Sequence, residues 1–159
     1  MSMGEVTVRA ADRPGDLGWV VMAHGELYAA EYGWAVEQVT AGIVAAYTPG
    51  PDAAWIAELD DRRVGCVFCV REDAGTARLR LLLLDPAARG LGVGRTLVRR
   101  CVAHARDAGF SRLVLWTNAP LAAARGIYLD EGFVLTAEEQ HDEFGVPLLG
   151  QDYELDLTA

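Results

Sequence analysis

The order of apolar and polar positions predicts a strand, two helices, three strands, a helix, a strand, a helix and two final strands. The expected strands are residues 5–10, 54–59, 64–71, 77–84, 113–116, 134–138 and 153–157, with a long polar loop between the last two. The expected helices are residues 17–32, 35–47, 92–108 and 121–130.

The best-defined helix, residues 92–108, places Val93, Leu97, Cys101 and Ala105 four residues apart on one face, with arginines on the other. In the second half, helices alternate with strands, which indicates a crossover between parallel strands. In the first half, short polar turns join consecutive strands, which favours antiparallel hairpins. We therefore expect an α/β fold: a mixed sheet with helices on both faces.

Length and composition indicate a single globular domain over residues 1–159. The chain has 159 residues, of which 52% are hydrophobic, enough to build one core. Asp85 and Pro86 interrupt the apolar run 81–84, so no membrane span is expected. Residues 1–10 lack the pattern of a secretion signal. The expected location is the cytoplasm.

The net charge of −9 argues against nucleic acid as a partner, because such domains usually carry a basic surface that neutralises phosphates. An acidic surface is compatible with a cationic acceptor such as an amine. Solubility alone is the more economical interpretation of this charge.

Cys66 and Cys69 have a C-x-x-C spacing, which occurs in metal and redox sites. They fall in a sequence that reads as a buried strand, where side chains three apart point to opposite faces. No second pair of Cys or His residues completes a zinc set, and the third cysteine, Cys101, makes the number odd. We expect buried core thiols and no metal site.

A glycine-rich turn between residues 84 and 96 is the most informative segment. It follows an apolar strand and opens a helix, whose first turn has free N–H groups and a partial positive charge. Glycines let that backbone approach a ligand closely. The segment predicts a cradle for phosphate or pyrophosphate, to which Arg89 and Arg95 add charge.

Three phosphate-binding patterns compete for this turn. The dinucleotide pattern G-x-G-x-x-G fails, since its last glycine falls on Arg95 or Leu97. The P-loop pattern fails because its first glycine falls on Arg89. The pattern R-x-x-G-x-G is met by Arg89, Gly92 and Gly94.

This third pattern resembles the coenzyme A pyrophosphate loop of GNAT acetyltransferases. A second segment, Ala124 to Phe133, resembles the family's A-x-x-x-Y-x-x-x-G-F motif with Tyr128 at its tyrosine. Segments 24–34, 115–118 and 144–155 are similar to the acetyltransferase halves of bacterial proteins in which that half follows a MarR-type DNA-binding domain. The likeness covers roughly residues 13–157 and implies a GNAT fold of about seven strands with a splayed parallel pair.

The resemblance implies acetyl-CoA as cofactor and assigns its contacts. Pantetheine would pair with the backbones of Leu82, Leu83 and Leu84, one of whose N–H groups would bind the developing oxyanion, and Asn118 and Tyr128 would also touch the cofactor. The pyrophosphate would lie on Arg89, Gly90, Leu91, Gly92, Val93, Gly94, Arg95 and Thr96. In family members the asparagine often lies seven residues before the tyrosine, a position that Leu121 holds here.

Tyr128 matches the family's proton donor to the departing thiolate. The glutamate that many members carry on the strand before the loop is missing, since residues 76–80 contain arginines and no carboxylate. Glu31, His24 and His141 are the alternatives for the general base, and Glu31 is our choice. His24, Tyr28 and Trp34 are the expected acceptor contacts, although ordinary helix packing also explains Tyr28.

The expected function is N-acetyltransfer from acetyl-CoA to a primary amine of a small molecule, amino acid or peptide. The alternatives are acetylation of a protein lysine, a coenzyme A sensor without turnover, and a nucleotide-phosphate binder. A homodimer is the expected assembly, because it is common in the family that the chain resembles.

Overall fold

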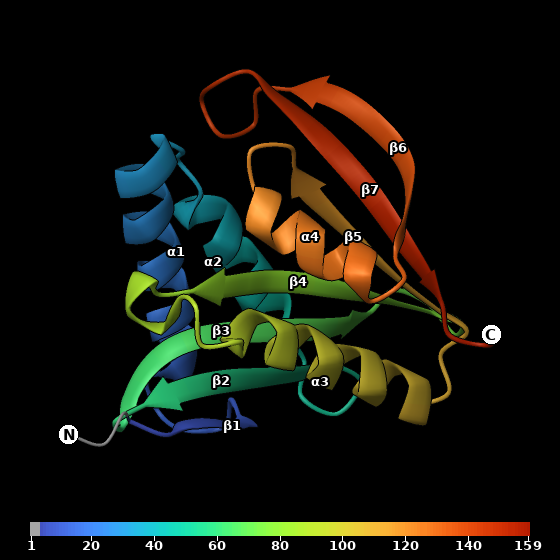
Figure 1. Cartoon of the computed structure of the whole chain (residues 1–159), viewed down its shortest axis with the longest axis horizontal. Coiled ribbons are helices and arrows are strands. Elements are labelled where there is room, and N and C mark those ends of the chain that lie inside the picture. Colours follow the sequence, from blue (N-terminus) through green and yellow to red (C-terminus); the bar gives the residue numbers. More distant parts are fainter. Residues whose placement is uncertain (1–3) are drawn as a thin grey trace.

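The computed structural model describes residues 4–159 as a seven-stranded sheet in the order β1-β2-β3-β4-β5-β7-β6 (Figure 1). The strands are β1 Val6–Ala10, β2 Ala53–Leu59, β3 Arg62–Arg71, β4 Thr76–Leu84, β5 Arg112–Asn118, β6 Val134–His141 and β7 Leu148–Asp156. The helices are α1 Asp16–Tyr32, α2 Glu37–Ala46, the short 3₁₀ helix η1 Pro86–Ala88, α3 Val93–Asp107 and α4 Ala122–Asp130. Each expected strand and helix is present in the expected order.

One pair of neighbouring strands, β4 and β5, runs parallel, and the other pairs run antiparallel. The parallel ladder is short: Thr76–Arg78 pairs with Arg112–Val114, and no pairing follows. Beyond Arg78 the two strands separate, while β4 remains paired to β3 and β5 to β7. The mixed, mostly antiparallel sheet with a splayed parallel pair is therefore confirmed.

Helices cover both faces of the sheet (Figure 1). The larger core packs α3 and α4 against one face, where Leu97 and Cys101 lie with Leu113. On the other face, Val20 of α1 packs against Phe68 in a second cluster. The region where β4 and β5 separate lies between these two helical layers.

The C-x-x-C thiols lie on opposite faces of β3, as expected. Cys66 belongs to the cluster under α1, and Cys69 lies in the cluster with Cys101 under α3. All three cysteines are free and buried. The spacing therefore reflects a strand buried on both faces.

A β-bulge interrupts β4 at the point where it leaves β5. Cys66 pairs with Leu83 and Phe68 with Arg80, so two residues of β4 lie opposite Val67. Leu81 accommodates the extra residue with a positive φ of 56°, and its carbonyl oxygen accepts a hydrogen bond from the Cys66 thiol at 3.1 Å. After the bulge, successive side chains of β4 no longer alternate regularly between the faces.

The start of α1 is held by an ion-pair network in place of a side-chain cap. Gly15 occupies the N-cap, and Asp16 is completely buried. Its carboxylate accepts hydrogen bonds from Arg9 at 2.8 Å, from Arg63 at 2.9 Å and from the Arg13 backbone N–H at 2.9 Å. These donors, Arg9 foremost, hold the pKa of Asp16 well below its usual range. The network fastens α1 to β1 and β3.

The structure differs from the expected boundaries mainly at the C-terminal hairpin. A long polar loop was expected between the last two strands. The loop in the structure is only residues 142–147, because β6 and β7 extend further on both sides of it. Residues 134–140 of β6 are exposed at the sheet edge, among them the apolar Val134 and Leu135. Residues 139–141, expected in the polar loop, belong to this edge strand. No helix within residues 4–159 is long and apolar enough to cross a membrane.

Candidate functional site

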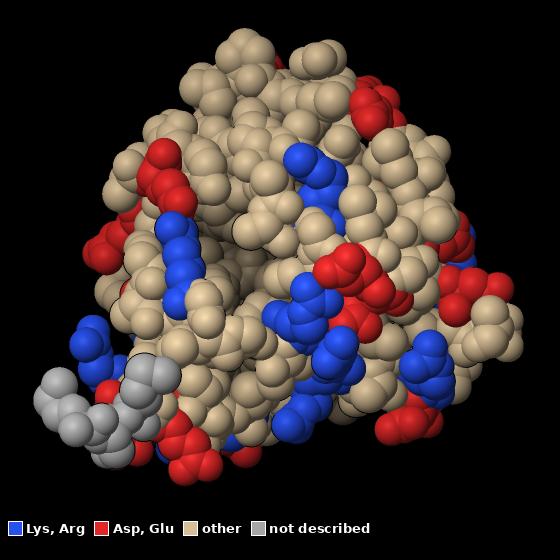
Figure 2. Space-filling view, viewed as in Figure 1, with Lys and Arg blue, Asp and Glu red and all other residues tan. Residues whose placement is uncertain are grey.

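A cavity of about 1000 Å³ opens where β4 and β5 separate. Helices α1 and α2 form one wall of the cavity. The β4–α3 turn, α4 and the β6–β7 loop form the rest of its lining. Figure 2 shows a hollow in the surface between the parts of the molecule built by α1 and α4. A cavity of this size accommodates a cofactor and a small second substrate.

The glycine-rich turn forms the end of this cavity at the start of α3. Gly90 and Gly92 have φ values of 80° and 76°, and a Cβ at either would meet no heavy atom within 4 Å. Gly92 is the N-cap of α3 and has no side-chain cap, so the first N–H groups of the helix have no side-chain acceptor there. The open space and the helix dipole fit a pyrophosphate.

Most of the residues expected to hold the pyrophosphate line the cavity. They are Arg89, Gly90, Gly92, Val93, Gly94 and Arg95. Leu91 and Thr96 lie outside the lining: Leu91 is exposed, and the Thr96 hydroxyl donates to the Gly92 carbonyl at 3.0 Å.

The two arginines of the turn are already paired with carboxylates. Arg89 contacts Glu31 of α1 at 2.6 Å, and Arg95 contacts Asp130 of α4 at 2.8 Å. These pairs are partly exposed and therefore weak, so a phosphate can exchange with the carboxylates. The Arg89–Glu31 pair joins the proposed base to the proposed cofactor cradle.

Leu82, Leu83 and Leu84 follow the bulge and line the cavity. They lie beyond the last residue of β4 that pairs with β5, so the backbone edge that faces β5 has no strand partner. Such an edge can pair with the amides of an extended ligand, as an added strand does.

Tyr128 of α4 lies at the wall of the same cavity and is buried. Its ring packs against Phe133, with centroids 5.7 Å apart, and against Tyr153 at 6.3 Å. Burial raises the pKa of Tyr128, and the neighbouring Tyr28 and Cys101 raise it further. Tyr128 therefore keeps its proton at neutral pH and can act as a donor.

His24 is buried in α1 and lines the cavity. Its Nδ1 lies 2.7 Å from the Val20 carbonyl, which requires a proton on Nδ1. Burial lowers the pKa of His24 to about 4, so the ring is neutral at pH 7. A neutral Nε2 is a hydrogen-bond acceptor of low basicity.

Aromatic rings from α1 and the following loop form one wall. The Trp34 ring stacks on the rings of Tyr32 and Tyr28, with centroids 4.5 Å and 5.7 Å apart. Its centroid lies 5.9 Å from that of Phe144. Tyr28 and Trp34 line the cavity, although Trp34 is only 4% exposed. Both serve packing and lining at once.

His141 lies beside Asn118, and both of its ring nitrogens have partners. Its Nε2 lies 2.6 Å from Asn118 Oδ1, while the Glu143 N–H donates to Nδ1 at 3.2 Å. The ring is thus the Nε2-protonated tautomer with both nitrogens engaged. Asn118 is buried at the end of β5 and keeps its NH₂ group for donation.

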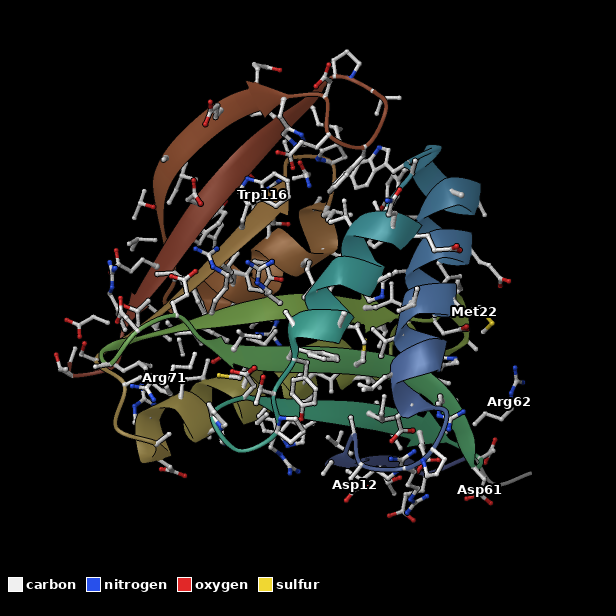
Figure 3. All side chains as sticks on the ribbon, turned by 180° about the vertical axis from the view of Figure 1, so that it is seen from behind. Asp12, Met22, Asp61, Arg62, Arg71 and Trp116 are labelled. Atoms are coloured by element: carbon white, nitrogen blue, oxygen red, sulfur yellow. The ribbon has the colours of Figure 1, made fainter. Side chains whose placement is uncertain are left out.

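Several cavity residues were not predicted from the sequence as site residues. Trp116 of β5 is 38% exposed, and Figure 3, which looks from the α1 and α2 side, labels it to the left of α2. Others include Val39, Thr40 and Ile43 of α2, Arg78 and Arg80 of β4, Glu139 of β6, Asp152 of β7, and Glu143 and Phe144 of the loop. No signal in the sequence marks Trp116 as a site residue, because its exposure is a property of the folded chain.

A splayed parallel strand pair, an anion cradle at a helix start and a protonated tyrosine in one cavity define a class of acyltransferase that takes its acyl group from a thioester of coenzyme A. The sequence profile of the acetyltransferase (GNAT) family matches residues 19–133. The chain belongs to this family.

Named relatives agree with that assignment, and a solved structure shares the fold. N-acetyltransferase 8B from Homo sapiens is 36% identical over 89 residues, 53% of this chain and 39% of the relative. Mycothiol acetyltransferase from Beutenbergia cavernae is 36% identical over 75 residues, 47% of this chain and 25% of the relative. The chain thus spans well under half of these relatives. An acetyltransferase from Salmonella typhimurium, solved with its cofactor acetyl-CoA, superposes with a TM-score of 0.77 at 22% identity, covering 96% of this chain and 94% of the other.

Proposed function

We propose that the chain is an N-acetyltransferase that moves the acetyl group of acetyl-CoA to a primary amine of a small molecule, amino acid or peptide. The observation that carries this proposal is a single cavity that joins the split between β4 and β5, the start of α3 and Tyr128. The family, relatives named as N-acetyltransferases and the Salmonella complex support it.

We assign the donor site to three groups of residues. Loop amides around Gly92 and the arginines Arg89 and Arg95 hold the pyrophosphate. The free backbone edge of Leu82–Leu84 holds the pantetheine amides, and the Asn118 NH₂ group donates to the same arm.

The acetyl donor supplies an activated carbonyl carbon, at which a C–N bond to the amine replaces the C–S bond. A strand N–H near Leu82 binds the carbonyl oxygen as its negative charge grows. The Tyr128 hydroxyl donates its proton to the departing sulfur. Glu31 accepts the proton that the amine loses, through a water molecule.

Glu31→Gln is expected to lower kcat about 100-fold at pH 7, because removal of a general base typically costs that much. Glu31 also pairs with Arg89. Loss of that pair alone would instead raise the KM for acetyl-CoA and leave kcat unchanged, which would contradict Glu31 as the base. Glu26→Gln, on the same helix and outside the cavity lining, is the control.

Thermal unfolding with and without acetyl-CoA tests the donor site, with ATP as the control ligand. At about 100 times its Kd, acetyl-CoA should add about 2.7 kcal/mol of stability, which raises the Tm by about 5–10 °C. ATP should leave the Tm unchanged. No shift with acetyl-CoA would contradict the acetyltransferase proposal. A shift without thiol release on any amine would favour a sensor.

We also propose the cytoplasm as the site of action. Three free, buried thiols fit a reducing compartment.

A further inference from the structure

One arginine in the cavity lacks a partner. Apart from Arg80, every arginine within residues 4–159 that is at least partly buried makes an ion pair or a hydrogen bond; these are Arg9, Arg63, Arg78, Arg95 and Arg125. Arg80 is half-buried, lines the cavity and contacts no carboxylate or carbonyl within the described chain. A guanidinium has five donors, and leaving them without acceptors in a partly desolvated place is costly.

Arg80 lies at the centre of the functional region. It is two residues beyond Arg78, the last residue of β4 that pairs with β5, and directly precedes the bulge at Leu81. Ala77 and Leu79 are buried in the core under α3, so the alternating Arg80 faces the α1 and α2 side of the sheet. Burial lowers the pKa of Arg80, and the nearby charge of Arg78 lowers it further, yet a guanidinium stays charged at neutral pH.

The other side of the cavity carries the opposite charge. Asp152 alternates with Tyr153, which is buried under α3, so it faces the same side as Arg80. Asp152, Glu139 and Glu143 line the cavity, and none of them forms an ion pair within residues 4–159. The cavity therefore offers an unpaired cation on β4 and unpaired carboxylates on β6, β7 and the loop between them.

We propose that the acceptor is an amine that also carries a carboxylate, such as a free α-amino acid, and that Arg80 binds this carboxylate. The proposal rests on the proposed N-acetyltransferase function. The guanidinium matches a carboxylate with two parallel hydrogen bonds, and the acidic side of the cavity attracts the ammonium group before it loses its proton. Trp116 and Phe144 contact each other in the cavity wall and provide an apolar surface for the rest of the acceptor.

Paired substrates test this assignment. Phenylalanine with phenethylamine, and leucine with isoamylamine, differ only in the carboxylate. The parent protein should have a kcat/KM at least tenfold higher for each amino acid than for its decarboxylated partner. Arg80→Met should lower kcat/KM for the amino acids about 100-fold and change it less than threefold for the amines, in keeping with the loss of a bidentate charged contact. Arg80→Lys should restore part of the loss.

Binding gives a readout that does not need turnover. With coenzyme A present at saturation, phenylalanine or leucine should raise the Tm of the parent protein and leave that of Arg80→Met unchanged. Arg106→Met is the matched control, since Arg106 is exposed on α3, has no ion pair within residues 4–159 and lies outside the cavity. It should behave as the parent does.

The two proposals fail in different ways. Equal binding and turnover of amines and amino acids, with equal effects of Arg80→Met on both, would overturn the carboxylate assignment and leave acetyl transfer intact. Absence of any Tm shift with acetyl-CoA would instead overturn the proposed function. Absence of an amino-acid shift in the parent protein saturated with coenzyme A would overturn the carboxylate assignment by itself.

Discussion

Gly92→Val is expected to weaken acetyl-CoA binding by about 100-fold or more, the equivalent of one or two charge-assisted hydrogen bonds. Gly92 is the N-cap of α3, and a Cβ there projects into space free of protein atoms within 4 Å. That space is where the pyrophosphate must approach the backbone. Isothermal titration with acetyl-CoA measures the loss.

Backbone strain must be separated from this effect. Valine is strained at the φ of 76° that Gly92 adopts, at a cost of about 1–2 kcal/mol of stability. Gly109→Val is the matched control: Gly109 follows the other end of α3, has a φ of 89°, and a Cβ added there would also meet no heavy atom within 4 Å. We expect the control to lose similar stability and keep its affinity. If Gly92→Val bound acetyl-CoA as tightly as Gly109→Val does, the loop would not hold the cofactor.

Tyr128→Phe should reduce kcat about 100-fold while the Kd for acetyl-CoA changes less than threefold, because the hydroxyl acts on the departing sulfur. The ring, its burial and its contacts with Phe133 and Tyr153 are retained in phenylalanine. Because burial raises the pKa of Tyr128, the parent should show no loss of kcat from Tyr128 deprotonation as the pH rises from 7 to 10. Steady-state kinetics with thiol detection measure these values.

Tyr153→Phe is the control for this variant. Tyr153 is buried beside Tyr128 but does not line the cavity. It should retain the kcat of the parent. Unchanged turnover in Tyr128→Phe would remove the tyrosine as proton donor, whereas equal losses in both variants would indicate a packing effect.

Local sequence signals predict the elements, and most of the residues expected on the cofactor side line one cavity. The glycines at 90, 92 and 94 mark the α3 start directly, because their role depends on backbone conformation near them in the chain. Tyr128 lies in a compact motif on one helix. The cysteine pair on β3 follows from strand alternation alone.

The acceptor side depends on contacts that sequence alone does not specify. Asp152 and Glu139 reach the cavity because β7 inserts between β5 and β6, an arrangement set by long-range register. The bulge at Leu81 was not predicted, because the sequence there contains no glycine that would indicate a positive φ. In the sequence, Arg80 stood out only because an arginine lies in a segment where many family members carry a glutamate. Its lack of a partner is a property of the folded cavity. The homodimer and the likeness to MarR-linked acetyltransferase halves stay predictions.

The burial of all three cysteines has a consequence for how the protein is handled in solution. Cys66, Cys69 and Cys101 are at most 2% exposed, so none of them is accessible to a reagent in the native state. A thiol-reactive dye added to a turnover assay will therefore colour with released coenzyme A and not with the enzyme. In denaturant the same dye gains three reactive sites per chain on unfolding, so one reagent can follow both catalysis and loss of structure.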